Sequence, residues 1–313
     1  MIYTSLSDIP YRKEQAIIIN VGTRFVSSLA LLSTIKRGGM PVLLIDCSYQ
    51  NRTDDFDFFK SLMSDFSFDL FSMRLDNHGK TLDYLFRNLN TDFILLVDSD
   101  LEILDDTIVG LMRKYIQKPN VFGSGFQHGG LWLEKKVHWE ENRNGYYEER
   151  MFIPFTLLNV KKIREALEFG ISFDIRQEYN LLHFNQNLSR RILNSPKLNK
   201  LPFFRNYEYN IFNIFKKVYH KKKPLIILHD TGSDIYMYLR YQKSYFFAGV
   251  DANTTIESDF VKHYSGITRR LMYDDPYNTT SVDVEYLNIR QRLMYEYSFD
   301  YENFNSSFYN KSL

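Results

Sequence analysis

The chain has 313 residues, enough for one large α/β domain or two smaller ones, and its 39 basic and 38 acidic side chains almost cancel. This balance excludes the global field that attracts nucleic acid, so we expect no nucleic-acid partner. The single cysteine, Cys47, excludes an internal disulfide framework and favours a reducing compartment. The N-terminus is polar and no apolar stretch is long enough to span a bilayer, so we expect a cytoplasmic protein.

The first hundred residues alternate between strand patterns and helix patterns. Short apolar runs rich in β-branched residues indicate buried strands, and longer stretches with helical spacing lie between them. This alternation predicts an α/β fold with a mostly parallel, doubly wound sheet and helices on both faces. The expected elements are a strand at 16–21, a helix at 26–36, a strand at 41–46, a helix at 54–66, an extended piece at 68–74, a helix at 79–89 and a strand at 92–100.

The pattern weakens after residue 121, where apolar runs remain at 151–158 and 224–229. A further helix is expected near 283–297, within a polar tail rich in Tyr and Asn. We expect residues 1–270 to form one domain with halves 1–120 and 121–270, followed by a C-terminal helical extension over 271–313.

Residues 205–223 place apolar side chains at helical spacing and end in a basic cluster. Two interpretations stay open for this helix. It packs against the core with a solvated basic end, or it lies on a membrane surface and contacts an anionic lipid-linked acceptor. The second interpretation would make the protein peripheral to the inner face of the membrane.

Polar side chains follow the predicted strands where each one ends. Ligands of parallel α/β sheets collect at the carboxyl ends of the strands. Asp98 and Asp100, two residues apart after an apolar strand, can bind one hard cation that also binds a diphosphate. The alternative is a polar strand end or a helix cap. The polar residues at these strand ends are Thr23, Arg24, Asp46, Asn77, Asp98, Ser99 and Asp100.

Four fragments in the same order resemble the family 2 glycosyltransferases of the GT-A fold. They are AIIINVGTR, LLIDCS, Asn77-His78-Gly79 before a helix, and ILLVDSDLEIL. The resemblance implies a metal-dependent enzyme of polysaccharide biosynthesis. It would transfer a sugar from a nucleotide sugar, by default a UDP-sugar, to a saccharide or lipid-linked saccharide. Residues 1–120 would then bind the nucleotide and residues 121–270 the acceptor.

The same resemblance implies roles for single residues. His263, within FVKHYSGITRR, matches a His that completes the metal site for Mn²⁺ or Mg²⁺, and His229 is the rival ligand. One group of four residues would contact the nucleotide, and a second group of three would contact its ribose and the metal. The first group is Thr23, Arg24, Asp46 and Asn77, and the second is Asp98, Ser99 and Asp100.

LHDTGSDIYMYLR (228–240) resembles the segment that carries the family's catalytic carboxylate, with His229-Asp230 in place of Glu-Asp. Asp230 or Asp234 would take the proton of the acceptor hydroxyl in an inverting transfer. Asp230 is favoured because it precedes a Thr-Gly-Ser turn that would hold it at a helix start. The alternative is structural, with Asp230 as a helix cap and Asp234 as an acid of the first helical turn.

Two other functions compete with a glycosyltransferase. A sugar-nucleotide nucleotidyltransferase shares the sheet but carries a Gly-rich, basic loop after the first strand, and GTRFVSS has one Gly and one Arg. A catalytically inactive sugar-binding protein of the same fold is the second alternative. The acidic residues Asp98, Asp100 and Asp230, with His263, argue against the inactive protein.

Overall fold

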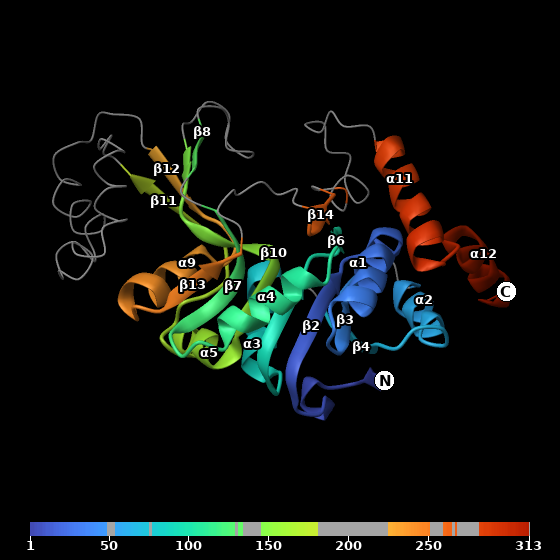
Figure 1. Cartoon of the computed structure of the whole chain (residues 1–313), viewed down its shortest axis with the longest axis horizontal. Helices are drawn as coiled ribbons and strands as arrows, with labels where there is room; N and C mark the ends of the chain where they lie inside the picture. The colour runs from blue at the N-terminus through green and yellow to red at the C-terminus, as the bar shows by residue number, and fades with distance from the viewer. Residues whose placement is uncertain are drawn as a thin grey trace.

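An eight-stranded sheet forms the centre of the molecule (Figure 1). The computed structural model describes residues 1–48, 54–74, 77–128, 131–133, 145–180, 225–250, 259–264, 267 and 282–312.

The strand order of this sheet is β1-β4-β3-β2-β5-β10-β7-β13. Only β10 runs antiparallel to its neighbours, and every other pair is parallel. The predicted α/β fold with a mostly parallel sheet is therefore confirmed. The strands are β1 Ile2–Tyr3, β2 Arg12–Asn20, β3 Val42–Asp46, β4 Asp69–Ser72, β5 Thr91–Val97, β7 Val121–His128, β10 Arg150–Asn159 and β13 Phe246–Gly249.

Helices cover both faces of the sheet because its central strands are apolar on both sides. Along β2, Ala16 and Ile18 enter one buried cluster while Ile17 and Ile19 enter the other, as the two-residue period of a strand requires. The doubly wound arrangement is thus confirmed. One face carries α1 Arg24–Arg37, α2 Asp55–Leu62 and α4 Thr107–Ile116, and the other carries α3 His78–Asn88, α5 Val160–Glu168, α9 Ser233–Met237 and η4 Tyr238–Gln242; the short η1 Leu6–Asp8 precedes β2.

Two smaller sheets flank the carboxyl edge of the central sheet. The first has the order β11-β12-β9-β8. The second joins β6, directly after β5, to β14, which lies beside it although it is far away in the sequence (Figure 1). The apolar run at 224–229 is confirmed as β12, whereas the helix expected at 205–223 lies outside the described residues. The strands are β6 Leu101–Ile103, β8 Leu131–Leu133, β9 Gly145–Tyr147, β11 Arg176–Asn180, β12 Leu225–His229 and β14 Val261–His263.

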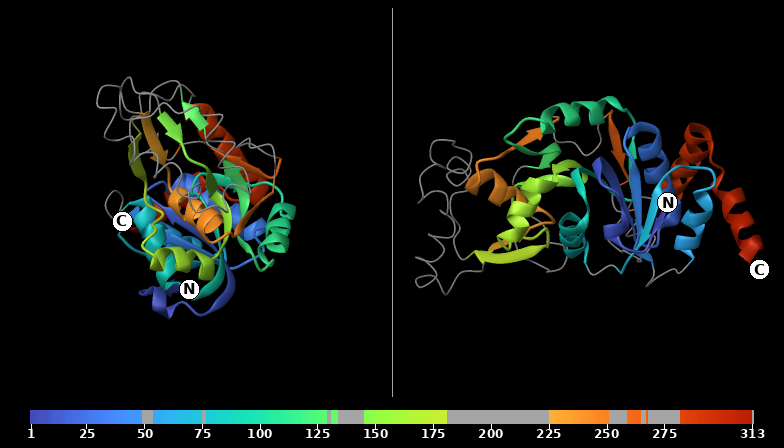
Figure 2. Two further views of the ribbon diagram at one scale, coloured as in Figure 1. Left: turned by 90° about the vertical axis from the view of Figure 1, so that its left-hand side faces the viewer. Right: turned by 90° about the horizontal axis from the view of Figure 1, so that it is seen from below.

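The C-terminal residues form α11 (Val282–Gln291), the π-helical turn η5 (Arg292–Glu296) and α12 (Tyr301–Ser312), which confirms the helix expected near 283–297. Figure 2 shows these helices at the end of the molecule that carries α2, away from β11 and β12. The ring of Phe25 in α1 stacks on Tyr286 with centroids 4.2 Å apart. The extension thus shares the apolar cluster of α1 and α2, and a domain boundary near residue 270 stays a prediction.

None of the helices in the described ranges combines the length and the apolar character needed to cross a membrane.

Candidate functional site

Three predicted metal ligands meet at the carboxyl end of β5. Asp98 follows the last residue of this strand, and the chain then enters β6. β14 pairs with β6 so that His263 lies opposite Leu101, and the amide of Tyr264 donates a hydrogen bond of 2.8 Å to the carbonyl of Asp100. The short ladder thus brings His263 to the two carboxylates.

The three side chains have the spacing of a cation site. The Nε2 atom of His263 lies 3.0 Å from Oδ1 of Asp100 and 3.8 Å from Oδ2 of Asp98. One ligand atom from each residue lies within 4.8 Å of the other two, and no other such trio of acidic, His or Cys residues occurs in the described part of the chain. Asp100 is almost fully buried, while the Asp98 side chain is 35% exposed. A cation held here can therefore be reached by a ligand from solvent.

The charges within this cluster depend on one another. Burial raises the pKa of Asp98, but His263 and then His78 outweigh it and lower the pKa below its usual range. Burial lowers the pKa of His263, but the carboxylates of Asp100 and Asp98 outweigh it and raise the pKa to about 10. A proton on His263 thus balances two carboxylates, and a cation that binds here must replace it.

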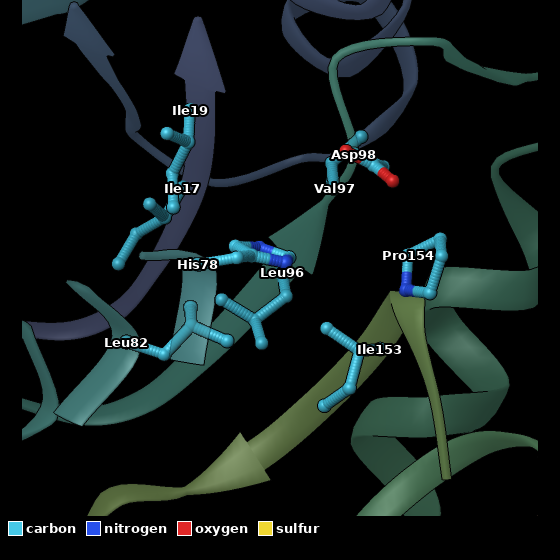
Figure 3. A pocket seen from close by; sticks show the side chains of 9 residues that line it. All are labelled: Ile17, Ile19, His78, Leu82, Leu96, Val97, Asp98, Ile153 and Pro154. Carbon is cyan, nitrogen blue, oxygen red and sulfur yellow. The ribbon is translucent and has the colours of Figure 1, made fainter. Parts of the chain in front are cut away.

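A pocket with an apolar floor lies beside Asp98 (Figure 3). Side chains of β2, β5 and β10 form the floor, and His78 from the start of α3 and Asp98 are its polar members. The cavity itself is small, about 20 Å³, which is room for a water molecule, so a flat ring enters only if the lining moves apart. The lining residues are Ile17, Ile19, His78, Leu82, Leu96, Val97, Asp98, Ile153 and Pro154.

The start of α3 explains the Asn-His-Gly fragment structurally. Asn77 caps the helix, because its side-chain oxygen accepts a hydrogen bond of 2.8 Å from the amide of Lys80. Gly79 packs against the turn after α5, where an added Cβ atom would lie 2.4 Å from Cα of Asp174. This close contact fixes the start of α3 and so places His78 at the pocket.

A buried polar network fixes the loop after β2. The side-chain nitrogen Nδ2 of Asn20 donates to Asp46 at 2.8 Å and to Asp55 at 3.0 Å. The side-chain oxygen Oδ1 accepts from the backbone amide of Thr23 and the hydroxyl of Ser27. Asp46 is 1% exposed, so its predicted contact with the nucleotide needs a change in this network. Sequence reasoning missed Asn20 and Asp55, although the polar end of the run AIIIN was a signal for the first.

Thr23 and Arg24, the other predicted nucleotide contacts, are also buried. The Thr23 hydroxyl makes no hydrogen bond to any described residue, and the side chain is buried. Arg24 forms an ion pair of 2.6 Å with Asp54, and its guanidinium lies over the rings of Phe58 and Phe308. The structure thus gives Arg24 an internal role that joins α1, α2 and α12.

Asp230 lies directly after β12, but the N-cap of α9 is Gly232, so the alternative role of Asp230 as a helix cap is wrong. Its carbonyl accepts from the amide of Ser233 at 2.8 Å, and Gly232 has a φ of +80° immediately before α9. Oδ2 of Asp230 lies 3.1 Å from Nε of Arg150, and the side chain is 37% exposed. Arg150 lies opposite His128 in the antiparallel register of β10 and β7. Asp230 therefore combines access to solvent with one fixed cationic partner.

Asp234 has both of its oxygens engaged. Arg176 approaches them at 2.8 Å and 3.0 Å, and Nδ1 of His229 lies 2.7 Å from Oδ1. Burial raises the pKa of Asp234, but His229 and Arg176 outweigh it and hold the pKa well below its usual range. A carboxylate with so low a pKa is a weak base, which argues against Asp234. Both oxygens of Asp230 also have partners, Arg150 and the amide of Thr231, but its side chain is the more exposed of the two. His229 belongs to this group, whereas His263 lies at the metal cluster.

No family model and no curated protein sequence matches the chain. Its structure is similar to the mannosyltransferase PcManGT from Pyrobaculum calidifontis in complex with GDP-Man and Mn²⁺, at 9% identity and a TM-score of 0.37 over 52% of this chain and 49% of that one. It is also similar to the glycosyltransferase GlyE of Streptococcus pneumoniae, at 10% identity and a TM-score of 0.40 over 96% of this chain and 64% of that one.

A third similar structure is 4-diphosphocytidyl-2C-methyl-D-erythritol synthase from Anaerococcus prevotii, at 10% identity and a TM-score of 0.37 over 71% of this chain and 91% of that one. The chain thus spans about half of the mannosyltransferase and just under two thirds of GlyE. At these identities and TM-scores the similarities assign no function, so the functional argument rests on the site.

Proposed function

We propose that this protein is a metal-dependent glycosyltransferase that moves a sugar from a nucleoside diphosphate to an acceptor hydroxyl. The observation that carries the proposal is the trio Asp98, Asp100 and His263, gathered within 4.8 Å at the carboxyl end of β5. Ligands of parallel α/β sheets bind at this edge.

The side chains present fit a divalent cation. Two carboxylates supply the oxygen ligands that Mg²⁺ and Mn²⁺ prefer, and the imidazole of His263 favours the transition metal Mn²⁺. When bound, the cation supplies positive charge against the departing diphosphate. Asp98 is the more exposed carboxylate, so it is placed to contact the substrate as well.

The nucleoside would bind beside Asp98, where the lining of the small cavity has to open to admit it. The floor of the cavity gives an aromatic base an apolar surface, while His78 and Asp98 offer polar partners for the base or ribose. Thr23 and Asn77 lie at the same edge of the sheet. Thr23 is the last residue before α1, and Asn77 is the last residue before α3. A UDP-sugar is the donor we propose first, from the resemblance to the family 2 enzymes.

Asp230 is the general base in this proposal. Its carboxylate, oriented by Arg150 on Oδ2 and by the amide of Thr231 on Oδ1, is 37% exposed and would accept the proton of the acceptor hydroxyl. Such a base predicts inversion at the anomeric carbon, and proton NMR of the product distinguishes inversion from retention. The acceptor in this proposal is a saccharide or a lipid-linked saccharide, and the enzyme works at the cytoplasmic face of the membrane or in the cytoplasm.

The proposal is tested by incubating purified protein with a panel of nucleotide sugars, with and without Mn²⁺, and measuring free nucleoside diphosphate. Many transferases slowly hydrolyse their donor, so the assay needs no acceptor. We expect Mn²⁺-dependent release from one donor, lost in Asp100→Ala and kept in Asp106→Ala, an exposed acid outside the cluster. A nucleoside triphosphate with a sugar 1-phosphate is included, because release of pyrophosphate there would indicate a nucleotidyltransferase instead.

A further inference from the structure

Glu102 is a fully buried carboxylate two residues after Asp100, on β6. A buried charge is costly unless it is paired and all its lone pairs are satisfied. Arg292 donates to Oε1 of Glu102 from Nε at 2.9 Å and from Nη2 at 2.6 Å. The hydroxyls of Tyr297 and Tyr264 donate at 2.7 Å and 3.0 Å. Nε of Arg292 also donates to Oε2 at 3.2 Å, so Glu102 accepts five hydrogen bonds from three residues.

These donors come from two separate parts of the chain. Arg292 and Tyr297 belong to the C-terminal extension, at η5 and just after it. Tyr264 directly follows His263, and its amide is bonded to the carbonyl of Asp100. The carboxylate of Glu102 thus connects the extension to the chain segments that carry two of the three metal ligands.

The ladder that places His263 needs such support because it is short. β6 and β14 pair over only three residues each, and an isolated two-stranded ladder is marginal in water. The register sets Lys262 opposite Glu102 and His263 opposite Leu101. Holding Glu102 and Tyr264 together therefore holds the two strands in the register that brings His263 to Asp100.

Arg292 supplies the charge of this connection. In the described part of the chain it is the only cation within 4.0 Å of the Glu102 carboxylate. A second set of contacts fastens the same turn to α1, where Lys36 binds Glu296 at 2.9 Å. Glu296 is also bound by Arg37 and lies 4.0 Å from Arg292. Removing the exposed Lys36 therefore takes away one contact of this turn and leaves the Arg292–Glu102 pair in place.

We propose that Arg292 is a positioning residue of the metal site. Through Glu102 and Tyr264, the C-terminal extension fixes the spacing of Asp100 and His263 and so sets the affinity for the cation. This inference rests on the proposed metal site, and it makes the extension a working part of that site.

The test is Mn²⁺ affinity of the full-length protein by calorimetry and by electron paramagnetic resonance of free Mn²⁺. Arg292→Met should weaken binding by about 10- to 100-fold, the usual effect of losing a partner behind a metal ligand. Arg292→Lys keeps the charge and should recover part of the loss, although it lacks the guanidinium fork. Lys36→Met, which loosens the extension at the surface only, should bind Mn²⁺ as the wild type does.

A second variant keeps the test valid if Arg292→Met does not fold. Tyr264→Phe leaves the ion pair of Arg292 with Glu102 intact. It removes only the hydroxyl through which Tyr264, the residue after His263, binds Glu102. We expect roughly tenfold weaker Mn²⁺ binding. Thermal unfolding of each variant sets a temperature at which all are folded.

The outcomes separate the two proposals. Absence of Mn²⁺ binding by the wild type, or equal binding by Asp100→Ala, overturns the metal site itself. Binding that is lost in Asp100→Ala but unchanged in both Arg292→Met and Tyr264→Phe overturns the positioning role alone. An equal loss in Lys36→Met also overturns it, because any loosening of the extension would then have the same effect.

Discussion

Replacing Asp55 with asparagine should stabilise the protein above pH 6. Asp55 is the first residue of α2 and is 0% exposed. Burial raises the pKa of its carboxyl to about 6, from 3.8, against the opposing effects of the Asn20 hydrogen bond and the Arg24 charge. The folded protein therefore holds a costly charge here at neutral pH, and asparagine can still accept the bond from Asn20.

The magnitude follows from proton linkage. Between pH 3.8 and 6 the folded state binds a proton that the unfolded state has lost, so the free energy of unfolding falls as pH rises through this window. The difference of 2.2 units (6 − 3.8) corresponds to about 3 kcal/mol at 1.36 kcal/mol per unit. An acid in the first helical turn returns ~0.3–1 kcal/mol through the helix dipole. Asp55→Asn should thus gain about 2 kcal/mol at pH 7.5.

Urea unfolding at pH 4.5 and pH 7.5 measures this gain. The advantage of Asp55→Asn over the wild type should grow from the lower to the higher pH. Asp57→Asn is the matched control, because Asp57 lies in the same helical turn but is exposed, and its effect should be a few tenths of a kcal/mol at both pH values. A variant that is less stable than the wild type at pH 7.5, or a gain independent of pH, would refute the reasoning.

Three further predictions concern the site and its supports. Gly79→Ala should lower the free energy of unfolding by about 1–3 kcal/mol, because its Cβ would lie 2.4 Å from Cα of Asp174. Gly110→Ala is the control, because an added Cβ there has nothing within 4 Å and should not destabilise the protein. Urea unfolding of the two variants compares them. Asp230→Asn should lower kcat by roughly 10²–10⁴ without changing Mn²⁺ affinity, and an unchanged kcat contradicts its role as base. Treatment with EDTA should abolish turnover, Mn²⁺ should restore it, and His263→Ala should need more Mn²⁺ for half-maximal rate.

The sequence predicted the elements whose pattern is local and repeated. β2 and β3 follow from the apolar runs AIIIN and VLLID, and the helices between the strands follow from the helical spacing of their apolar residues. The parallel direction of the strands and the helices on both faces of the sheet also follow, because apolar strands separated by helices are buried on both sides. Element ends differed by a few residues, as for α2, which stops at Leu62 instead of residue 66.

Features that depend on distant partners could not be predicted from local pattern. β6 and β14 are three residues long, too short to give a period, so His263 was placed near the carboxylates only by resemblance. The sequence shows that Arg24 is charged but not that Asp54 neutralises it. Glu102 and Arg292 were likewise ordinary charges until the fold brought them together.

The most direct test of the central claim is calorimetric titration of nucleoside diphosphates into the purified protein, with Mn²⁺ and with EDTA. We expect UDP or another nucleoside diphosphate to bind only with Mn²⁺, and this binding to disappear in Asp100→Ala. Equally tight binding in EDTA, or no binding of any nucleoside diphosphate in the presence of Mn²⁺, would contradict a metal-dependent nucleotide-sugar site at Asp98, Asp100 and His263.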